Sequence, residues 1–329
     1  MGLFDNNPID SPEKPCEPQA AVTPSSAPAA EPASVLGGDP ISYVAVYPAS
    51  AHPPKSNLPE DLRISWSWVH LLVFVLFFFA IQFAIGTAVI GYYSVYRHVS
   101  QKQLERVLDS DTKLLAGTTL TIFALLILFL YVTLSLLRDM PFWRTLGWKK
   151  LKSDPLTGKG KPWMYFLSGF GLSFFVALAG SGAKDVEHAP IQEFFKSRNG
   201  AMLLMAMAVF VAPLAEETIY RGYLYPVLAR IVSSTAHFFG MEFPFAIRTG
   251  VVSSIFITGI LFGLMHGPQL GHNWTLVSLL MLVGVVFTFV RAWTGTVVAS
   301  FLLHLGYNSA IALTSIIATK GFTHMPTHP

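Results

Sequence analysis

The chain has 329 residues, of which 52% are hydrophobic and only 12% are charged, and its formal net charge is +3. Soluble domains carry about 25% charged residues, so this composition excludes an ordinary soluble protein and indicates an integral membrane protein. The net charge is too small to suggest nucleic-acid binding, and no basic run with interleaved aromatic residues occurs. Cys16 is the only cysteine, which excludes an intrachain disulfide and argues against a catalytic thiol.

Residues 1–62 differ from the rest of the chain in composition. They contain 12 of the 22 prolines, mixed with alanine, serine and acidic residues, and they show no helical periodicity. Such a segment has too little apolar surface to bury, so we predict a disordered, solvated tail in the cytoplasm. A short C-terminal tail is predicted at residues 319–329.

Two transmembrane helices and a basic loop are predicted within residues 63–162. The apolar runs 68–90 and 114–137 are long enough to cross a bilayer. The connection at 138–162 carries five lysines and two arginines, which places it in the cytoplasm under the positive-inside rule. The cations of the loop at 93–113 oppose this orientation.

Residues 163–318 are predicted to form the catalytic membrane domain, with spans at 163–180, 201–217, 218–239, 247–266, 275–290 and 296–318. If residues 216 and 266 are to meet, the polar, proline-containing segment 218–239 must cross back. We expect a distorted span there, which could begin as a direct continuation of the one before. The predicted fold class is therefore all-α, a polytopic membrane bundle of about eight transmembrane helices. Eight crossings would leave both termini on the cytoplasmic side of a plasma or inner membrane.

Two adjacent carboxylates and a guanidinium lie at the end of the run 201–217. Ionisable groups at membrane depth are costly, so they tend to face an interior cavity and to mark function. Glu217 and Arg221 stand at i,i+4 with the acid first, which is the favourable order for an ion pair. Glu216 points about 100° away from Glu217 on a helix of 3.6 residues per turn. We therefore predict that Glu217 is structural and that Glu216 is available for chemistry.

An aromatic ring and an imidazole lie one turn apart on the span at 247–266. They are Phe262 and His266. Glycine recurs beside them every four residues, which gives a face that lets a neighbouring helix approach closely; these positions are Gly259, Gly263 and Gly267.

The last span carries a polar stripe through an otherwise apolar helix. His304 and Asn308 stand at i,i+4, and Ser300 extends the stripe by one turn. Three helices thus offer a carboxylate, two imidazoles and an amide at comparable depths.

Three motifs in this order resemble those of the CPBP family, which comprises type II CAAX prenyl endopeptidases and bacteriocin-processing membrane proteases. They are Glu216-Glu217-x-x-x-Arg221, Phe262-x-x-x-His266 and His304-x-x-x-Asn308. The resemblance covers about residues 163–318. It implies an all-helical intramembrane protease whose cavity opens toward the cytosol and whose substrate is a membrane-associated peptide or protein.

The resemblance also implies a role for each motif residue. Glu216 and His266 would activate the attacking water, while His304 and Asn308 would stabilise the oxyanion. The supporting residues would hold the first pair in place; they are Glu217, Arg221 and Phe262.

Elementary chemistry agrees with these roles. Amide hydrolysis needs a base near the water and donors where the carbonyl oxygen gains charge. Glu216, His266 and His304 also have the ligand types of a site for zinc or another divalent metal. The single-helix HExxH motif is absent, so a metal is an option and not a requirement, and we favour direct activation of water.

Two other classes of protein could use the same buried polar groups. One is an ion- or proton-coupled carrier, but transporters often contain inverted repeats of spans and none is detected here. The other is a non-proteolytic scaffold or immunity protein of the same family, against which the intact motifs weigh. Cleavage of a membrane peptide would separate the protease from both alternatives.

Overall fold

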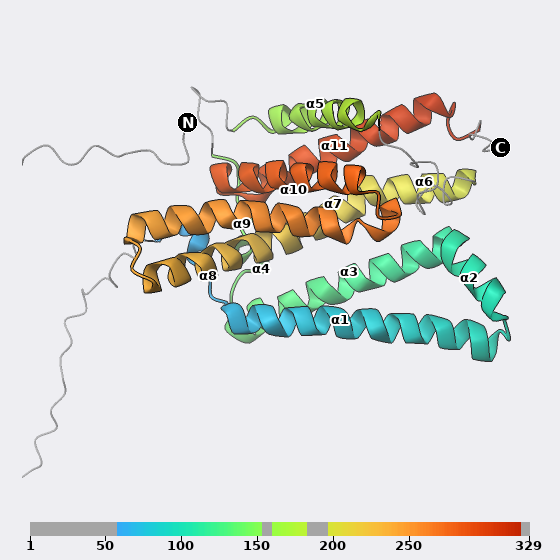
Figure 1. The fold of residues 1–329 in the computed structure, drawn as a ribbon, viewed down its shortest axis with the longest axis horizontal. Coiled ribbons are helices and arrows are strands. Elements are labelled where there is room, and N and C mark those ends of the chain that lie inside the picture. Colours follow the sequence, from blue (N-terminus) through green and yellow to red (C-terminus); the bar gives the residue numbers. More distant parts are fainter. Residues whose placement is uncertain (1–57, 153–159, 183–196, 324–329) are drawn as a thin grey trace, which may run out of the picture. The chain divides into compact units, whose positions relative to one another are not determined.

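The computed structural model describes residues 58–152, 160–182 and 197–323 (Figure 1). Within these ranges all regular structure is helical. The α-helices are α1 (Trp68–Gly91), α2 (Gln101–Ser110), α3 (Thr112–Leu134), α4 (Phe142–Thr145), α5 (Pro162–Gly180), α6 (Arg198–Ala206), α7 (Ala212–Glu216), α8 (Tyr225–Phe238), α9 (Phe243–Met265), α10 (Trp274–Thr294) and α11 (Val297–Ala318). Short 3-10 helices are η1 (Glu60–Leu62), η3 (Leu136–Arg138) and η8 (Pro268–Leu270), and π-helical segments are η2 (Tyr92–Tyr96), η6 (Met207–Val211) and η7 (Glu217–Leu224).

In the part of the chain that the structure describes, seven helices are long and apolar enough to cross a membrane. The all-α polytopic architecture is therefore confirmed, with one span fewer than the eight expected. The difference lies in the helix that carries the two glutamates, which continues from Arg198 to Phe238 over 41 residues. The predicted reversal at 218–239 is wrong, because this segment continues in the direction of the preceding span.

Two prolines are accommodated inside this long helix. Pro213 and Pro226 each lie two residues after a π-helical segment, at the second position of α7 and of α8. Proline lacks the N–H that an α-helix needs, and a π turn shifts the hydrogen-bond register by one residue. The missing donor is therefore absorbed without a break, and the helix stays continuous.

The return of the chain through α9 brings two of the motifs together. α9 packs along α8, and the ring of Phe262 near its end contacts the ring of Tyr220 in η7, with 5.4 Å between the centroids. The two motifs therefore meet at one depth although residues 218–239 do not reverse. The expectation of two cytoplasmic termini depended on eight crossings, and seven candidate spans occur in the described residues.

Close helix contacts through glycine fix the position of α11 against α5. A Cβ added at Gly306 would overlap the backbone of Phe166, and one added at Gly169 would overlap the backbone of Leu303. The predicted glycine face of α9 is confirmed at 259 and 263, where an added Cβ would meet α10. A Cβ added at Gly267 would meet only Leu264 in its own turn and His272, and no neighbouring helix.

We expect Gly306→Ala to lower thermal stability strongly. The added methyl would collide with main chain rather than with a flexible side chain, and such overpacking costs about 1–3 kcal/mol or more. Gly171→Ala is the matched control, because an added Cβ there meets nothing within 4 Å. The unfolding midpoints of both variants are measured by thermal unfolding of the purified proteins in detergent. Equal midpoints for the two variants would refute this account of the α5–α11 contact.

The segment before α1 packs against the bundle. Leu62 is fully buried, and the ring of Trp66 stacks on that of Tyr223 at 5.7 Å. Arg230 donates to the carbonyl oxygen of Ile64 at 2.7 Å. The compact unit therefore begins at residue 58. Of the tails predicted at 1–62 and 319–329, residues 1–57 and 324–329 lie outside the described residues.

The described part of the basic connection at 138–162 packs against the long helix and against the start of α11. Leu146 is fully buried, and Trp148 donates through Nε1 to the hydroxyl of Thr218 at 3.2 Å. The N–H of Val297 donates to the carbonyl of Gly147 at 2.9 Å. This connection thus contacts the residue that follows Glu217.

A half-buried imidazole, that of His70, connects α1 to α3 and to the long helix. Nδ1 of His70 lies 2.7 Å from the hydroxyl of Tyr223, and its Nε2 lies 2.9 Å from Oγ1 of Thr133. The hydroxyl of Thr133 already donates to the carbonyl of Phe129, so Nε2–H of His70 is the donor and Nδ1 accepts from Tyr223. No role was expected of His70 from the sequence.

Candidate active site

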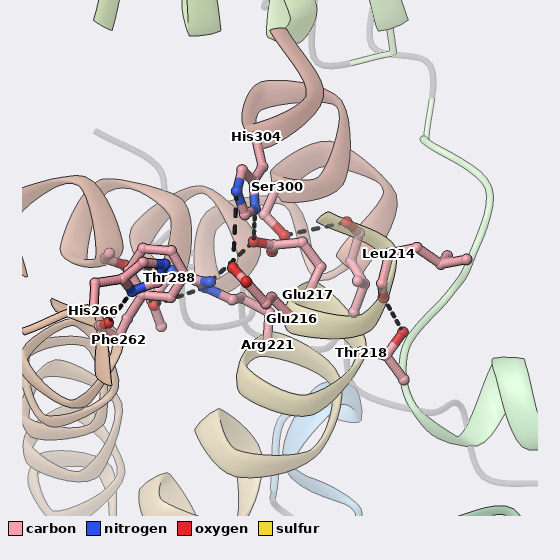
Figure 2. Close-up of polar contacts among 12 residues, drawn as sticks. Leu214, Glu216, Glu217, Thr218, Arg221, Phe262, His266, Thr288, Ser300 and His304 are labelled. Atoms are coloured by element: carbon pink, nitrogen blue, oxygen red, sulfur yellow. Dashed lines mark hydrogen bonds and ion pairs between the residues drawn. The ribbon is translucent and has the colours of Figure 1, made fainter. Parts of the chain in front are cut away.

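The two adjacent glutamates point to different partners, as helix geometry predicted. Glu217 is fully buried, and its Oε1 accepts from Nη1 of Arg221 at 2.9 Å and from Nδ1 of His304 at 3.0 Å (Figure 2). The predicted i,i+4 pair between Glu217 and Arg221 is therefore confirmed. It joins α11 as well, because the same carboxylate oxygen contacts the imidazole.

Arg221 is held by a ring of partners around its buried guanidinium. Its Nε donates to Oγ1 of Thr288 at 3.3 Å, and its Nη2 donates to the carbonyl of Gly284 at 3.0 Å. The guanidinium carbon also lies 4.6 Å from the centroid of Phe262 and 5.2 Å from that of Phe287, within the range of cation–π contact. The guanidinium is thus held in place by contacts with α9 and α10.

The imidazole of His304 stands between the two carboxylates. Its Nδ1 contacts Glu217, and its Nε2 lies 3.9 Å from Oε2 of Glu216, which is longer than a hydrogen bond (Figure 2). Because a carboxylate can only accept, the Nδ1–H of His304 donates to Glu217. The Nε2 atom is therefore the one directed toward Glu216, whose side chain is 13% exposed and lines a cavity.

His266 lies beside Phe262 at the end of α9. Its Nδ1 is 2.7 Å from the carbonyl oxygen of Phe262, and the two rings are 4.7 Å apart. A carbonyl oxygen is an acceptor only, so Nδ1 of His266 carries the proton in this contact. In the neutral ring Nε2 then keeps a lone pair that can take a proton.

Asn308 connects α11 to the π-helical segment η6. Its Nδ2 donates to the carbonyl of Ala208 at 2.7 Å, which fixes the amide and leaves one of its two N–H groups for another acceptor. Ser300, the third member of the predicted stripe, is fully buried and donates to the carbonyl of Val297 at 3.1 Å.

One cavity of about 630 Å³ brings the four predicted catalytic residues together. Its lining includes Glu216, His266, His304 and Asn308. A volume of this size encloses a small ligand or a short extended segment. The sequence-based expectation that three helices contribute to a single pocket therefore agrees with the geometry.

The position of the supporting pair differs from the expectation. Glu217 and Arg221 were expected to hold Glu216 and His266 in place. The described contacts of the Glu217 carboxylate go instead to Arg221 and His304. The pair consequently orients the imidazole on α11.

The residues present do not form a metal site in this arrangement. Among the residues that the structure describes, no three His, Cys, Asp or Glu side chains are grouped closely enough to hold a metal ion. Glu216, His266 and His304 line one cavity, but they are not assembled as a set of ligands.

Sequence reasoning missed the groups that complete the shell around Arg221. Thr288 and Gly284 come from α10, for which no functional residue was predicted. Their signal is weak, because a single threonine in an apolar helix usually donates to its own backbone. Thr288 does so here as well, to the carbonyl of Gly284 at 2.7 Å.

Comparison with known proteins agrees with the three motifs. Residues 198–310, about a third of the chain, match the family model described as type II CAAX prenyl endopeptidase Rce1-like. No curated protein and no solved structure matches the chain. The match supports a CAAX-protease-like intramembrane endopeptidase in general, and the seven apolar helices support an integral membrane protein. The matched residues 198–310 contain all three motifs, so the match agrees with the resemblance to the CPBP family.

Proposed function

We propose that this protein hydrolyses a peptide bond in a membrane-associated peptide or protein, using a water molecule activated by Glu216 and His266. The observation that carries the proposal is the approach of Glu216 to His304. These side chains come from separate helices, lie 3.9 Å apart and line the same cavity. A carboxylate and an oriented imidazole that line one cavity provide a base for the water and a donor for the oxygen of a bound carbonyl.

The first step is the addition of water to the scissile carbonyl. Glu216 takes a proton from the water, whose oxygen bonds to the carbonyl carbon while the C=O pair moves to oxygen. His266 lines the same cavity and assists in orienting the water. It does so through Nε2, because its Nδ1 is bonded to the carbonyl of Phe262. The C–N bond then breaks, and the proton held by Glu216 passes to the leaving amine.

The oxyanion formed in this step needs preorganised donors. Asn308 has one N–H group beyond its bond to Ala208, and protonated His304 offers Nε2–H. The Glu217 carboxylate accepts from Nδ1 of His304 at 3.0 Å, which fixes the ring with Nε2 directed toward the cavity. Removing one such donor typically costs about 10²–10³ in kcat.

The proposal is tested with purified protein in detergent or nanodiscs. The substrates are a prenylated CAAX peptide, suggested by the matched family, and a panel of membrane peptides with internal cleavage sites. We expect cleavage of at least one peptide, with His304→Ala and Glu216→Ala inactive and with no loss of rate after treatment with a chelator. Cleavage that both variants retain would overturn the assignment of this site, and a rate abolished by chelation and restored by zinc would overturn the metal-free mechanism.

A further inference from the structure

One wall of the cavity comes from a helix outside the matched domain. α3 precedes residues 198–310, yet five of its side chains line the cavity together with the catalytic residues. They recur at the spacing of one helix face and are Thr112, Leu115, Ala116, Thr119 and Phe123. The wall is therefore a continuous stripe of α3, which we call the α3 wall.

The cavity continues well beyond the catalytic residues. Along α11 its lining runs from His304 through Ile311 to Ala318, the last residue of the helix. This stretch of helix corresponds to about 21 Å at a rise of 1.5 Å per residue. A substrate bound at Glu216 would thus extend along the α3 wall for several residues on one side of the scissile bond.

The threonines of α3 behave differently according to the face that they occupy. Thr118 and Thr121, which do not line the cavity, donate to the carbonyls of Leu114 at 2.8 Å and of Gly117 at 2.7 Å. Thr119 lines the cavity, and within the described ranges its hydroxyl has no hydrogen-bond partner. Thr119 lies between the apolar residues Leu115, Ala116 and Phe123 of the α3 wall, and its donor is left available to whatever occupies the cavity.

We propose that the α3 wall binds an extended, apolar stretch of the substrate polypeptide, with Thr119 donating to one of its backbone carbonyls and Ala116 setting the size of the side chain admitted. The proposal rests on the peptidase function proposed above. An extended backbone brings carbonyl and N–H groups that need partners inside an apolar cavity, whereas a hydrocarbon chain brings none. A hydroxyl in the middle of the stripe therefore favours polypeptide as the occupant.

The hydrogen bond is tested by a pair of adjacent substitutions. Thr119→Val keeps the shape of the side chain and removes the donor, so we expect KM to rise about three- to tenfold while kcat stays unchanged, as for loss of one neutral hydrogen bond in uniform binding. Thr118→Val is the matched control, because its hydroxyl bonds within its own helix, and it should leave both constants unchanged. Equal KM values for the two variants would show that Thr119 does not bind the substrate.

The width of the wall is tested with substrates of graded size. For peptides with Phe or Trp beside the scissile bond, Ala116→Phe should lower kcat/KM at least about tenfold. For peptides with Ala or Gly there, kcat/KM should stay within about twofold of the wild-type value, because overpacking affects only large occupants. Leu120→Phe is the control, since Leu120 lies outside the cavity and is exposed. If Ala116→Phe affects all peptides equally, or selects by the length of an attached lipid chain, the polypeptide assignment is wrong. If the wild-type protein cleaves no peptide, the peptidase function itself fails, and the two failures are thereby distinguished.

Discussion

Glu216→Gln is expected to abolish almost all hydrolysis while leaving the protein folded. Glutamine has the shape of glutamate but cannot take a proton from water, and a positioned general base contributes about 10²–10⁴-fold to the rate. Glu216 lines the cavity and takes no part in the Glu217–Arg221 pair, so its charge is not needed to neutralise a buried partner. We therefore expect kcat to fall by that factor and KM to change little. Steady-state kinetics with a cleaved peptide measures both constants.

The matched controls for this prediction are Glu216→Asp and a thermal melt. Aspartate keeps a carboxylate but withdraws it by one methylene, so Glu216→Asp should retain an intermediate rate. The unfolding midpoint of Glu216→Gln should equal that of the wild type. A Glu216→Gln variant that cleaves at the wild-type rate would show that another group activates the water.

Breaking the buried ion pair is expected to have the largest effect on stability. Glu217 and Arg221 are both fully buried and joined at 2.9 Å. Removing one partner leaves an uncompensated charge in the interior, which costs about 3–5 kcal/mol. We therefore expect Glu217→Gln and Arg221→Met each to lower the free energy of unfolding by this amount, measured by denaturant or thermal unfolding in detergent.

The double variant separates stability from function. Glu217→Gln with Arg221→Met removes both charges together, so its stability should recover most of the loss of either single variant. Its activity should stay low, because His304 has lost the carboxylate that accepts from Nδ1–H and orients the ring. Losses of stability that simply add, or activity that returns with stability, would contradict the role assigned to this pair.

The sequence predicted those features that depend on helix periodicity. The divergence of Glu216 from Glu217 and the pairing of Glu217 with Arg221 follow from 3.6 residues per turn, and both occur. The close packing at Gly259 and Gly263 follows from a repeat of four residues on one face. Such local geometry needs no knowledge of neighbouring helices.

The number of spans could not be derived in the same way. The reversal after Glu217 was expected because residues 216 and 266 had to meet, and the proline in that segment suggested a distorted span. The structure instead continues the helix through Pro213 and Pro226 by placing a π-helical segment before each, and π turns are not recognisable from hydrophobic pattern. π-helical turns are frequent at functional sites, and η7 begins at Glu217.

Contacts between distant helices were also beyond the sequence. Glu217 and His304 are 87 positions apart, and their hydrogen bond depends on how α11 crosses η7. The α3 wall likewise depends on the packing of a helix that lies outside the three motifs. Apolar composition alone made α3 indistinguishable from a helix that faces only lipid.

The most direct test of the account is a structure of the Glu216→Gln variant with an uncleaved peptide bound in a lipid nanodisc. We predict that the scissile carbonyl oxygen lies within hydrogen-bonding distance, about 3.2 Å or less, of His304 Nε2 and Asn308 Nδ2. A water molecule should lie between the carbonyl carbon and the side chain at position 216. A peptide bound outside this cavity, or one whose scissile carbonyl contacts neither donor, would contradict the central claim that these three helices form one hydrolytic site.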